Sequence, residues 1–392
     1  MKSILFVLNI YPGIGGIESV TNSLADYLHN HYKVYTLSLT KVEDVSAPLG
    51  VTEAFVFPGE DADINKEYFN RLVNELNISL IVNQGMFLHM SDIIFNSDRN
   101  KAVPVVSCLH GMPGYEKHLF WGMPFVKSAS QRAKRRWRIK MLFNRCKPYN
   151  QLLDLFKDGY HRIFKESTRV VLLCNEYIAP FCEYYKLDSG EHKVMAIPNP
   201  LPEKYTKIAP VEWESKRNEI LFVGRVCPEK RIDLLLKMWS KVKSKNDWTL
   251  VIVGEGESLP DLKKLVISLN IDNVEFRPFT KTPEDYYIKA KFIALTSKFE
   301  GLPMSLIEAM RYGVIPVAFN ISDGVRSIVE NSGGTLIAMD KKNEYIKVLN
   351  HIVSGIYGCN NISQQVYQAS HGYVMDIVGK EWRKLIELLT SN

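Results

Sequence analysis

The chain has 392 residues, more than a single hydrophobic core usually supports, so its length predicts two domains. Hydrophobic residues make up 46% of the chain and charged residues 23%, a composition that excludes a disordered protein. No apolar run approaches the roughly 18 residues that a transmembrane helix needs. The net charge is +6, and the excess of positive charge is concentrated between residues 117 and 147.

Short β-branched runs alternate with longer amphipathic stretches along the chain. In the first half the runs lie at residues 4–8, 33–39, 78–83, 103–108 and 169–174. In the second half they lie at residues 219–224, 249–254, 273–279, 291–296, 314–319 and 334–338. Continuous apolar strands joined by helices are typical of parallel sheets buried on both faces. The sequence therefore predicts an α/β fold with two doubly wound, Rossmann-like domains and a cleft between them at the carboxyl ends of the strands.

The first predicted strand and the cysteines indicate the cellular compartment of the protein. The strand's apolar run is short and a Pro/Gly turn follows it, so residues 1–16 do not have the pattern of a signal peptide. The six cysteines form no C-x-x-C pair and no zinc-like cluster, which indicates buried thiols in a reducing environment. We expect a cytoplasmic protein.

The loop after the first strand, residues 11–18, reads Tyr-Pro-Gly-Ile-Gly-Gly-Ile-Glu. Glycine permits positive φ and lets a ligand approach the backbone closely. We expect Gly15 and Gly16 to be the close-approach positions, although an ordinary turn between strand and helix also accounts for them. The spacing does not fit the G-x-G-x-x-G motif, so a dinucleotide oxidoreductase is disfavoured.

Residues Asp61-Ala62-Asp63 form a D-x-D pattern, which can bind a metal ion. Here it lies in a loop before a predicted helix, where Asp favours N-capping, so we expect a helix cap and no metal site. His110 follows the strand at 103–108, and a single histidine there suits either a structural role or a place in a ligand pocket.

Residues 117–147 form a basic insert, which contains ten Lys/Arg residues and no Asp/Glu. Trp137 and Met141, and Ile139 and Phe143, are spaced four apart, so one helical face would be apolar. Such a helix suits an anionic membrane surface. An ordinary solvated insert is the main alternative, and nucleic-acid binding is disfavoured.

The domain boundary falls near residues 197–216, which contain four prolines and show no sustained periodicity. We expect an N-terminal domain at residues 1–198 and a C-terminal domain at residues 199–372. A final amphipathic helix at residues 373–392 should pack back on the N-terminal domain.

Residues 222–231, Phe-Val-Gly-Arg-Val-Cys-Pro-Glu-Lys-Arg, close the first strand of the second half and open its first helix. Arg225 can bind phosphate oxygens with its fork of N–H groups, and Lys230 supplies a point charge. Together they would bind a phosphate or diphosphate group and neutralise its charge.

The most informative segment is residues 299–310, Phe-Glu-Gly-Leu-Pro-Met-Ser-Leu-Ile-Glu-Ala-Met. Gly301 and Pro303 predict a tight turn after the strand at 291–296, and residues 305–312 predict a helix. The backbone N–H groups at the start of this helix can bind an anion. The carboxylate of Glu300 is suited to accept hydrogen bonds from sugar hydroxyls.

This segment resembles the E-x7-E signature of the retaining, GT4-type glycosyltransferases of the GT-B fold. The resemblance implies that Glu300 contacts hydroxyls of the donor sugar, that Glu308 contacts the ribose, and that the backbone of Gly301, Leu302, Pro303 and Met304 lies against the sugar and diphosphate. Gly224, Arg225 and Lys230 look like the family's G-R-x4-K motif, the diphosphate clamp.

The resemblance extends to three other parts of the chain. The loop with Gly15 and Gly16 would lie near the donor phosphates, and His110 would line the donor-sugar pocket. Arg277 and Phe279 end a strand near the expected base pocket, where relatives use backbone groups.

The sequence as a whole therefore predicts a glycosyltransferase. It would move a hexose or N-acetylhexosamine from a nucleoside diphosphate, UDP first and GDP second, to a glycan or lipid-linked acceptor in cell-surface polysaccharide biosynthesis, such as lipopolysaccharide or capsule. The resemblance implies front-face attack with retention of configuration and no metal or other cofactor. The alternative is a non-catalytic sugar-nucleotide binder or partner subunit of the same fold. An enzyme with a lipid-linked acceptor would lie at the inner face of the cytoplasmic membrane.

Overall fold

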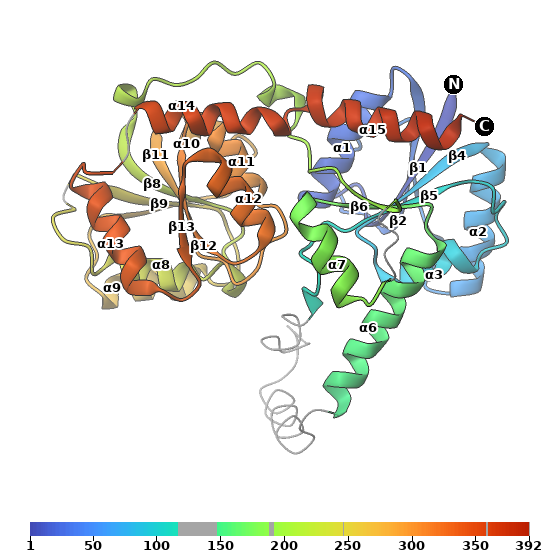
Figure 1. Ribbon diagram of the computed structural model, residues 1–392, viewed down its shortest axis with the longest axis horizontal. Coiled ribbons are helices and arrows are strands. Elements are labelled where there is room, and N and C mark those ends of the chain that lie inside the picture. The colour runs from blue at the N-terminus through green and yellow to red at the C-terminus, as the bar shows by residue number, and fades with distance from the viewer. Residues whose placement is uncertain (117–146, 188–191, 246, 358–359, 392) are drawn as a thin grey trace. The chain divides into compact units, whose positions relative to one another are not determined.

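The structure is a computed structural model of the 392-residue chain, and it describes residues 1–116, 147–187, 192–245, 247–357 and 360–391. The chain forms two compact units. The first comprises Met1–Ala196 together with Leu385–Asn392, and the second comprises Ile197–Lys384. Each unit is built on its own parallel sheet, as expected for two Rossmann-like domains (Figure 1).

The sheet of the first unit has seven strands in the order β3-β2-β1-β4-β5-β6-β7, all paired in parallel. Their bounds are β1 (Lys2–Ile10), β2 (Tyr32–Thr40), β3 (Glu53–Val56), β4 (Ile78–Gln84), β5 (Val105–Cys108), β6 (Arg169–Leu172) and β7 (Val194–Ala196). In the central strand β1, the side chains at residues 4–8 are at most 1% exposed. Burial on both faces explains why this strand is a continuous apolar run.

The helices of the first unit cover this sheet. They are α1 (Gly16–Leu28), α2 (Ala62–Glu75), α3 (Leu88–Asn96), α6 (Lys147–Glu166) and α7 (Ile178–Tyr184), with a 3₁₀ turn η1 (Asn175–Tyr177). Helix α3 packs between α2 and α6. The last residues of the chain also belong here, since Lys2 Nζ of β1 donates to the Thr390 carbonyl oxygen and hydroxyl.

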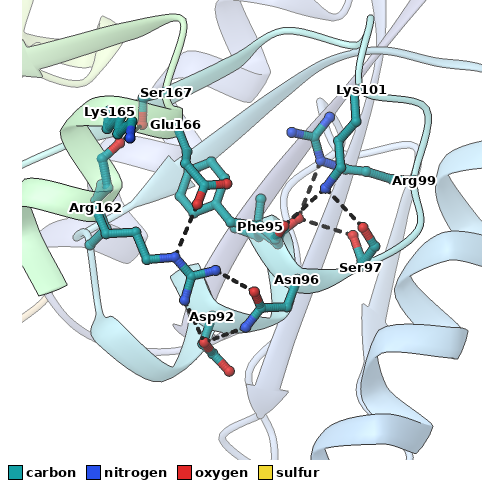
Figure 2. A network of polar contacts seen from close by, with 12 residues as sticks. Asp92, Phe95, Asn96, Ser97, Arg99, Lys101, Arg162, Lys165, Glu166 and Ser167 are labelled. Atoms are coloured by element: carbon teal, nitrogen blue, oxygen red, sulfur yellow. Dashed lines mark hydrogen bonds and ion pairs between the residues drawn. The ribbon is translucent and has the colours of Figure 1, made fainter.

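A polar network anchors α6 to the end of α3 (Figure 2). Arg162 of α6 donates to Asp92 at 3.0 Å, to Asn96 of α3 and to Glu166 at 3.0 Å. The carbonyl groups at the end of α3, which have no helical partner, accept from Arg99 and Lys101. A cavity of about 340 Å³ lies beside the network, and Leu88, His89, Ser91, Asp92, Phe95, Gly159, Arg162 and Ile163 line it. None of the predicted site residues is in this lining.

The sheet of the second unit has six parallel strands in the order β10-β9-β8-β11-β12-β13. Their bounds are β8 (Arg217–Val223), β9 (Thr249–Val253), β10 (Val274–Arg277), β11 (Ala290–Leu295), β12 (Ile315–Asn320) and β13 (Thr335–Ala338). Strands β8 and β11 are neighbours although some 70 residues separate them in the sequence. Their carboxyl ends therefore lie at one sheet edge, which is where ligands of such sheets bind.

The helices of the second unit form two groups on opposite sides of its sheet (Figure 1). One group is α8 (Ile232–Trp239), α9 (Leu259–Ser268) and α13 (Lys342–Val353), and the other is α10 (Glu284–Tyr287), α11 (Met304–Met310), α12 (Asp323–Ser332) and α14 (Asn360–Ala369). Four 3₁₀ turns complete the unit: η2 (Glu203–Tyr205), η3 (Trp213–Ser215), η4 (Pro228–Lys230) and η5 (Ser370–Tyr373). The final helix α15 (Met375–Thr390) begins in this unit and ends in the first.

All eleven strands predicted from the sequence are present, and the doubly wound parallel architecture is confirmed. Two strands were missed, β3 and β7, and they are the two edge strands of the first sheet. Both are short, and their side chains are mostly only half-buried. Incomplete burial of these two strands weakens the apolar pattern, although β10 and β13, the edge strands of the second sheet, were predicted.

Among the residues that the structure describes, no helix is both long and apolar enough to cross a membrane. The basic insert lies, apart from Lys147 at the start of α6, outside the described residues. The expectation of a membrane-binding face therefore stays a prediction from the sequence.

Candidate functional site

The loop from β8 to α8 holds the two predicted phosphate-binding side chains. Gly224 directly follows the strand and has a φ of +152°, a backbone conformation that favours glycine. The next residue, Arg225, is exposed, whereas Val226 and Cys227 are buried and anchor the loop. Lys230 ends the 3₁₀ turn η4 and is partly exposed. Both cations are therefore held by a fixed backbone at the carboxyl edge of the sheet.

Two glycines that the sequence analysis did not single out support this loop. Gly254 and Gly256 follow β9, with φ values of +143° and +155°. A Cβ atom on Gly254 would lie 2.0 Å from the Gly224 carbonyl oxygen, and one on Gly256 would lie 2.2 Å from that of Val226. The backbones are also hydrogen-bonded, because Val226 N–H donates to the Glu255 carbonyl at 2.8 Å. The G-x-G pattern directly after a buried strand is the sequence signal that could have identified them.

Gly256→Ala is expected to lower the free energy of unfolding by about 2–3 kcal/mol, because the new methyl group meets backbone atoms at a strained φ. Urea unfolding measures the change. Gly372→Ala is the matched control, since a Cβ there meets nothing within 4 Å, and its effect should stay within about 0.5 kcal/mol. If the Gly256 variant were as stable as the control, the loop would not be held by this contact.

The loop after β11 brings a carboxylate to Lys230. Glu300 Oε1 accepts from Lys230 Nζ at 2.5 Å and from the hydroxyl of the buried Ser297 at 2.7 Å. Two further bonds tie the loops together. The Thr296 hydroxyl donates to the Lys230 carbonyl at 3.1 Å, and Lys298 N–H donates to the Glu229 carbonyl at 2.8 Å. The adjacency of β8 and β11 thus places a cation and an anion side by side.

Residues Gly301–Pro303 form the turn before α11, in which Leu302 is buried and Met304 is the first helical residue. The helix predicted at 305–312 is thereby confirmed, one residue earlier at its start. Directly after it, the wholly buried Arg311 donates to the carbonyl oxygens of Tyr205 at 2.9 Å and Thr206 at 3.2 Å. These bonds fix α11 to the segment that precedes β8.

Glu308, the second predicted glutamate, lies in the middle of α11 and is partly buried. Its Oε2 accepts from the hydroxyl of the buried Tyr287 at 2.8 Å. Burial raises the pKa of Glu308, while the hydrogen bond from Tyr287 and the charge of Lys204 act in the opposite direction. Sequence analysis did not identify Tyr287, which ends a four-residue helix without a recognisable motif.

Arg277 and Phe279 lie at the end of the edge strand β10. The Arg277 guanidinium pairs with Glu275 at 2.5 Å, and its carbonyl oxygen accepts from Gly254 N–H at 3.0 Å. The Phe279 side chain is 51% exposed. Both side chains are therefore about half exposed at this edge of the sheet.

In the loop after β1, the glycines do not have the positive φ that glycine permits. Gly15 is extended, with φ −171° and ψ 177°, and neither Gly15 nor Gly16 has a positive φ. A Cβ on Gly15 would lie 2.2 Å from Glu18 Oε2, the end of a flexible side chain that can shift, so this contact does not by itself require glycine. A Cβ on Gly16 meets nothing within 4 Å, and its backbone remains accessible. Burial raises the pKa of Glu18.

His110 follows β5 and lies beside the end of β4. Its Nε2 is 2.5 Å from Oε1 of the wholly buried Gln84. Because an amide oxygen only accepts, His110 Nε2 carries the proton in this contact. Strands β1, β4 and β5 are neighbours, so their carboxyl ends lie at one edge of the first sheet. This edge carries Gly15, Gln84 and His110. Gln84 is a further residue that sequence analysis missed.

The Asp61-Ala62-Asp63 pattern is a helix cap, as predicted. Asp61 Oδ1 accepts from the N–H groups of Asp63 at 2.9 Å and Ile64 at 3.0 Å, and these bonds lower the pKa of Asp61. Within the part of the chain that the structure describes, no group of three His, Cys, Asp or Glu side chains is arranged to hold a metal ion.

Comparison with known proteins shows what the second unit is similar to. Residues 204–369 match the family model of the glycosyl transferases group 1. An uncharacterized glycosyltransferase of Haemophilus influenzae is 34% identical over 201 residues, 50% of this chain and 55% of its own. The amylovoran biosynthesis glycosyltransferase AmsD of Erwinia amylovora is 30% identical over 172 residues, 44% of this chain and 48% of its own. The matches thus span about half the length of these relatives.

The fold as a whole has solved counterparts. The Anabaena protein HepE, in complex with UDP-glucose, superimposes with a TM-score of 0.71 at 15% identity. The superposition covers 99% of this chain and 100% of that one. Two Rossmann-like parallel-sheet domains joined in this way constitute the GT-B fold, which confirms the predicted fold class.

Proposed function

We propose, from the premise that residues 204–369 form a domain of the glycosyl transferases group 1, that this chain transfers a sugar from a nucleoside diphosphate to a glycan or lipid-linked acceptor. The observation that supports this most is the contact between Lys230 and Glu300 at the ends of two neighbouring strands. A sugar nucleotide carries an anionic diphosphate next to ring hydroxyls. It therefore needs a cation and a hydrogen-bond acceptor within a few ångströms of each other.

In this proposal Arg225 and Lys230 bind the diphosphate and stabilise the charge that develops as it leaves. Glu300 accepts hydrogen bonds from the donor sugar, with Ser297 fixing its carboxylate. The backbone of Gly301–Met304 lies against the sugar and diphosphate. Glu308 binds the ribose. The exposed Phe279 ring lies on the side of the base.

For the donor we propose UDP before GDP, with a hexose or N-acetylhexosamine as the sugar. The UDP-glucose in the HepE structure makes that compound the first to test. For the acceptor we propose a growing cell-surface polysaccharide. Transfer proceeds with retention of configuration by front-face attack, in which the leaving phosphate takes the proton of the acceptor hydroxyl.

Contact with an anionic membrane remains part of the proposal on sequence grounds alone. The ten basic residues at 117–147 would bind anionic lipid, with each nearby Lys or Arg contributing roughly 1 kcal/mol. A lipid-linked acceptor would be presented at such a surface.

A panel of UDP- and GDP-sugars tests the proposed function. Binding is scored by the rise in unfolding temperature, and turnover by release of nucleoside diphosphate with oligosaccharide and lipid-linked acceptors. We expect one donor to stabilise the protein and to be consumed, and NMR of the product to show the retained anomer. Stabilisation without turnover would favour the non-catalytic binder, and no stabilisation by any donor would contradict the proposal.

A further inference from the structure

A buried tyrosine approaches the predicted ribose-binding carboxylate from inside the protein. Tyr287, at the end of α10, is 0% exposed, and its hydroxyl donates to Glu308 Oε2 at 2.8 Å. Helix α10 packs on α11, which carries Glu308. Glu308 itself is partly exposed. The two oxygens of the carboxylate therefore differ. Tyr287 donates to Oε2, whereas no side chain among the residues that the structure describes donates a hydrogen bond to Oε1.

The position of the Tyr287 hydroxyl is fixed by its surroundings. The buried Lys216 donates from Nζ to the carbonyl oxygens of Tyr287 at 3.2 Å, Ile288 at 3.4 Å and Ala290 at 3.1 Å. These bonds hold the turn between α10 and β11, and burial lowers the pKa of Lys216 to about 7. The Tyr287 ring also packs against Tyr312, with 5.9 Å between the ring centroids. Neither the ring nor its backbone is free to follow a movement of Glu308.

The groups around Glu308 act in opposite directions on its pKa, and the hydrogen bond from Tyr287 is one of the two that favour the ionised carboxylate. Burial raises the pKa of Glu308, and the nearby Glu284 raises it further, although Glu284 is itself paired with Lys204. The Tyr287 hydroxyl and the Lys204 ammonium favour the ionised carboxylate. A phenol donates only one proton, so the carboxylate keeps acceptor capacity for a ligand, including both lone pairs of Oε1.

We propose that Tyr287 is a positioning residue for nucleoside recognition: it fixes the Glu308 carboxylate by Oε2, so that Oε1 accepts hydrogen bonds from the ribose hydroxyls of the donor. The inference rests on the proposed function, in which Glu308 binds the ribose. It adds that the affinity for the ribose diol depends on a residue that the ligand does not touch.

The test is Tyr287→Phe, which removes one oxygen atom from a buried ring. Calorimetry compares the Kd of UDP with that of 2′-deoxy-UDP, and of GDP with 2′-deoxy-GDP if GDP is the better ligand. We expect Tyr287→Phe to raise the Kd of the ribonucleotide about tenfold and that of the deoxynucleotide less than about twofold, because only the former uses the fixed oxygen. A merely structural role would weaken both ligands equally.

Tyr345→Phe is the matched control. Tyr345 is also 0% exposed, and its hydroxyl donates to a backbone carbonyl, that of Val317, at 2.9 Å. The two variants lose the same atom from the same kind of site, so they should be destabilised alike, and the Kd of UDP should change only in Tyr287→Phe.

A double-mutant cycle with Glu308→Gln keeps the inference testable even if Tyr287→Phe is poorly stable. Glu308→Gln should by itself reduce the preference for the ribonucleotide, and Tyr287→Phe should reduce it little further in that background. Equal loss for ribo- and deoxynucleotide, or additive losses in the double variant, would overturn the positioning role while leaving the proposed function intact. Wild-type protein that binds neither UDP nor GDP would overturn the proposed function and this inference with it.

Discussion

Lys230→Ala is expected to lower kcat/KM for sugar transfer about 10³-fold, equivalent to about 4 kcal/mol of transition-state stabilisation. The ammonium of Lys230 lies at the carboxyl edge of β8, and the charge on a nucleoside diphosphate increases as the bond to the sugar breaks. The loss should therefore appear in kcat as well as in KM, since the cation binds the transition state better than the donor. Steady-state release of nucleoside diphosphate measures both constants.

Lys230→Ala should change the free energy of unfolding less than it changes the stabilisation of the transition state. The side chains of Lys230 and Glu300 are 25% and 14% exposed, so we expect the free energy of unfolding to fall by about 1–2 kcal/mol. Lys237→Ala is the control, because Lys237 forms an ion pair of 2.9 Å with Asp233 on the exposed face of α8. It should keep wild-type kinetics. A Lys230 variant within about threefold of wild-type kcat/KM would rule out its role on the leaving group.

Glu300→Gln is expected to lower kcat/KM about 10²- to 10³-fold. A carboxylate only accepts hydrogen bonds, whereas the amide presents N–H₂ donors to the sugar hydroxyls on one side. The substitution also removes the negative partner of Lys230, whose Nζ lies 2.5 Å from Glu300 Oε1. The measurement is again steady-state turnover, with thermal unfolding to verify the fold. Glu381→Gln, which removes an exposed partner of Lys384, should leave the rate unchanged.

The two substitutions should not be additive. Lys230 and Glu300 are in direct contact, so the variant with both changes is expected to lose less than the product of the single losses. Additive losses would mean that the two side chains act on separate parts of the donor without influencing each other.

The sequence alone determined the class of fold and the segments that carry the chemistry. Eleven short β-branched runs predicted eleven strands, and a central strand such as β1 is a continuous apolar run because it is buried on both faces. The predicted helix after Glu300 is α11, and the cap predicted at Asp61 is present. These features are local: a few consecutive residues determine whether a segment is buried, turns or begins a helix. The edge strands β3 and β7 were missed because partial burial weakens that local signal.

Only the tertiary structure decided which of these segments meet. Lys230 contacts Glu300 because β8 and β11 are neighbours, and strand order depends on how the whole sheet is wound. The same holds for Gly256 beneath the Val226 carbonyl and for Gln84 beside His110, which come from adjacent strands. Tyr287 reaches Glu308 from a short helix without a motif. A residue's sequence neighbours set its local conformation, but its partners across a parallel sheet are set by crossover connections that no local pattern encodes.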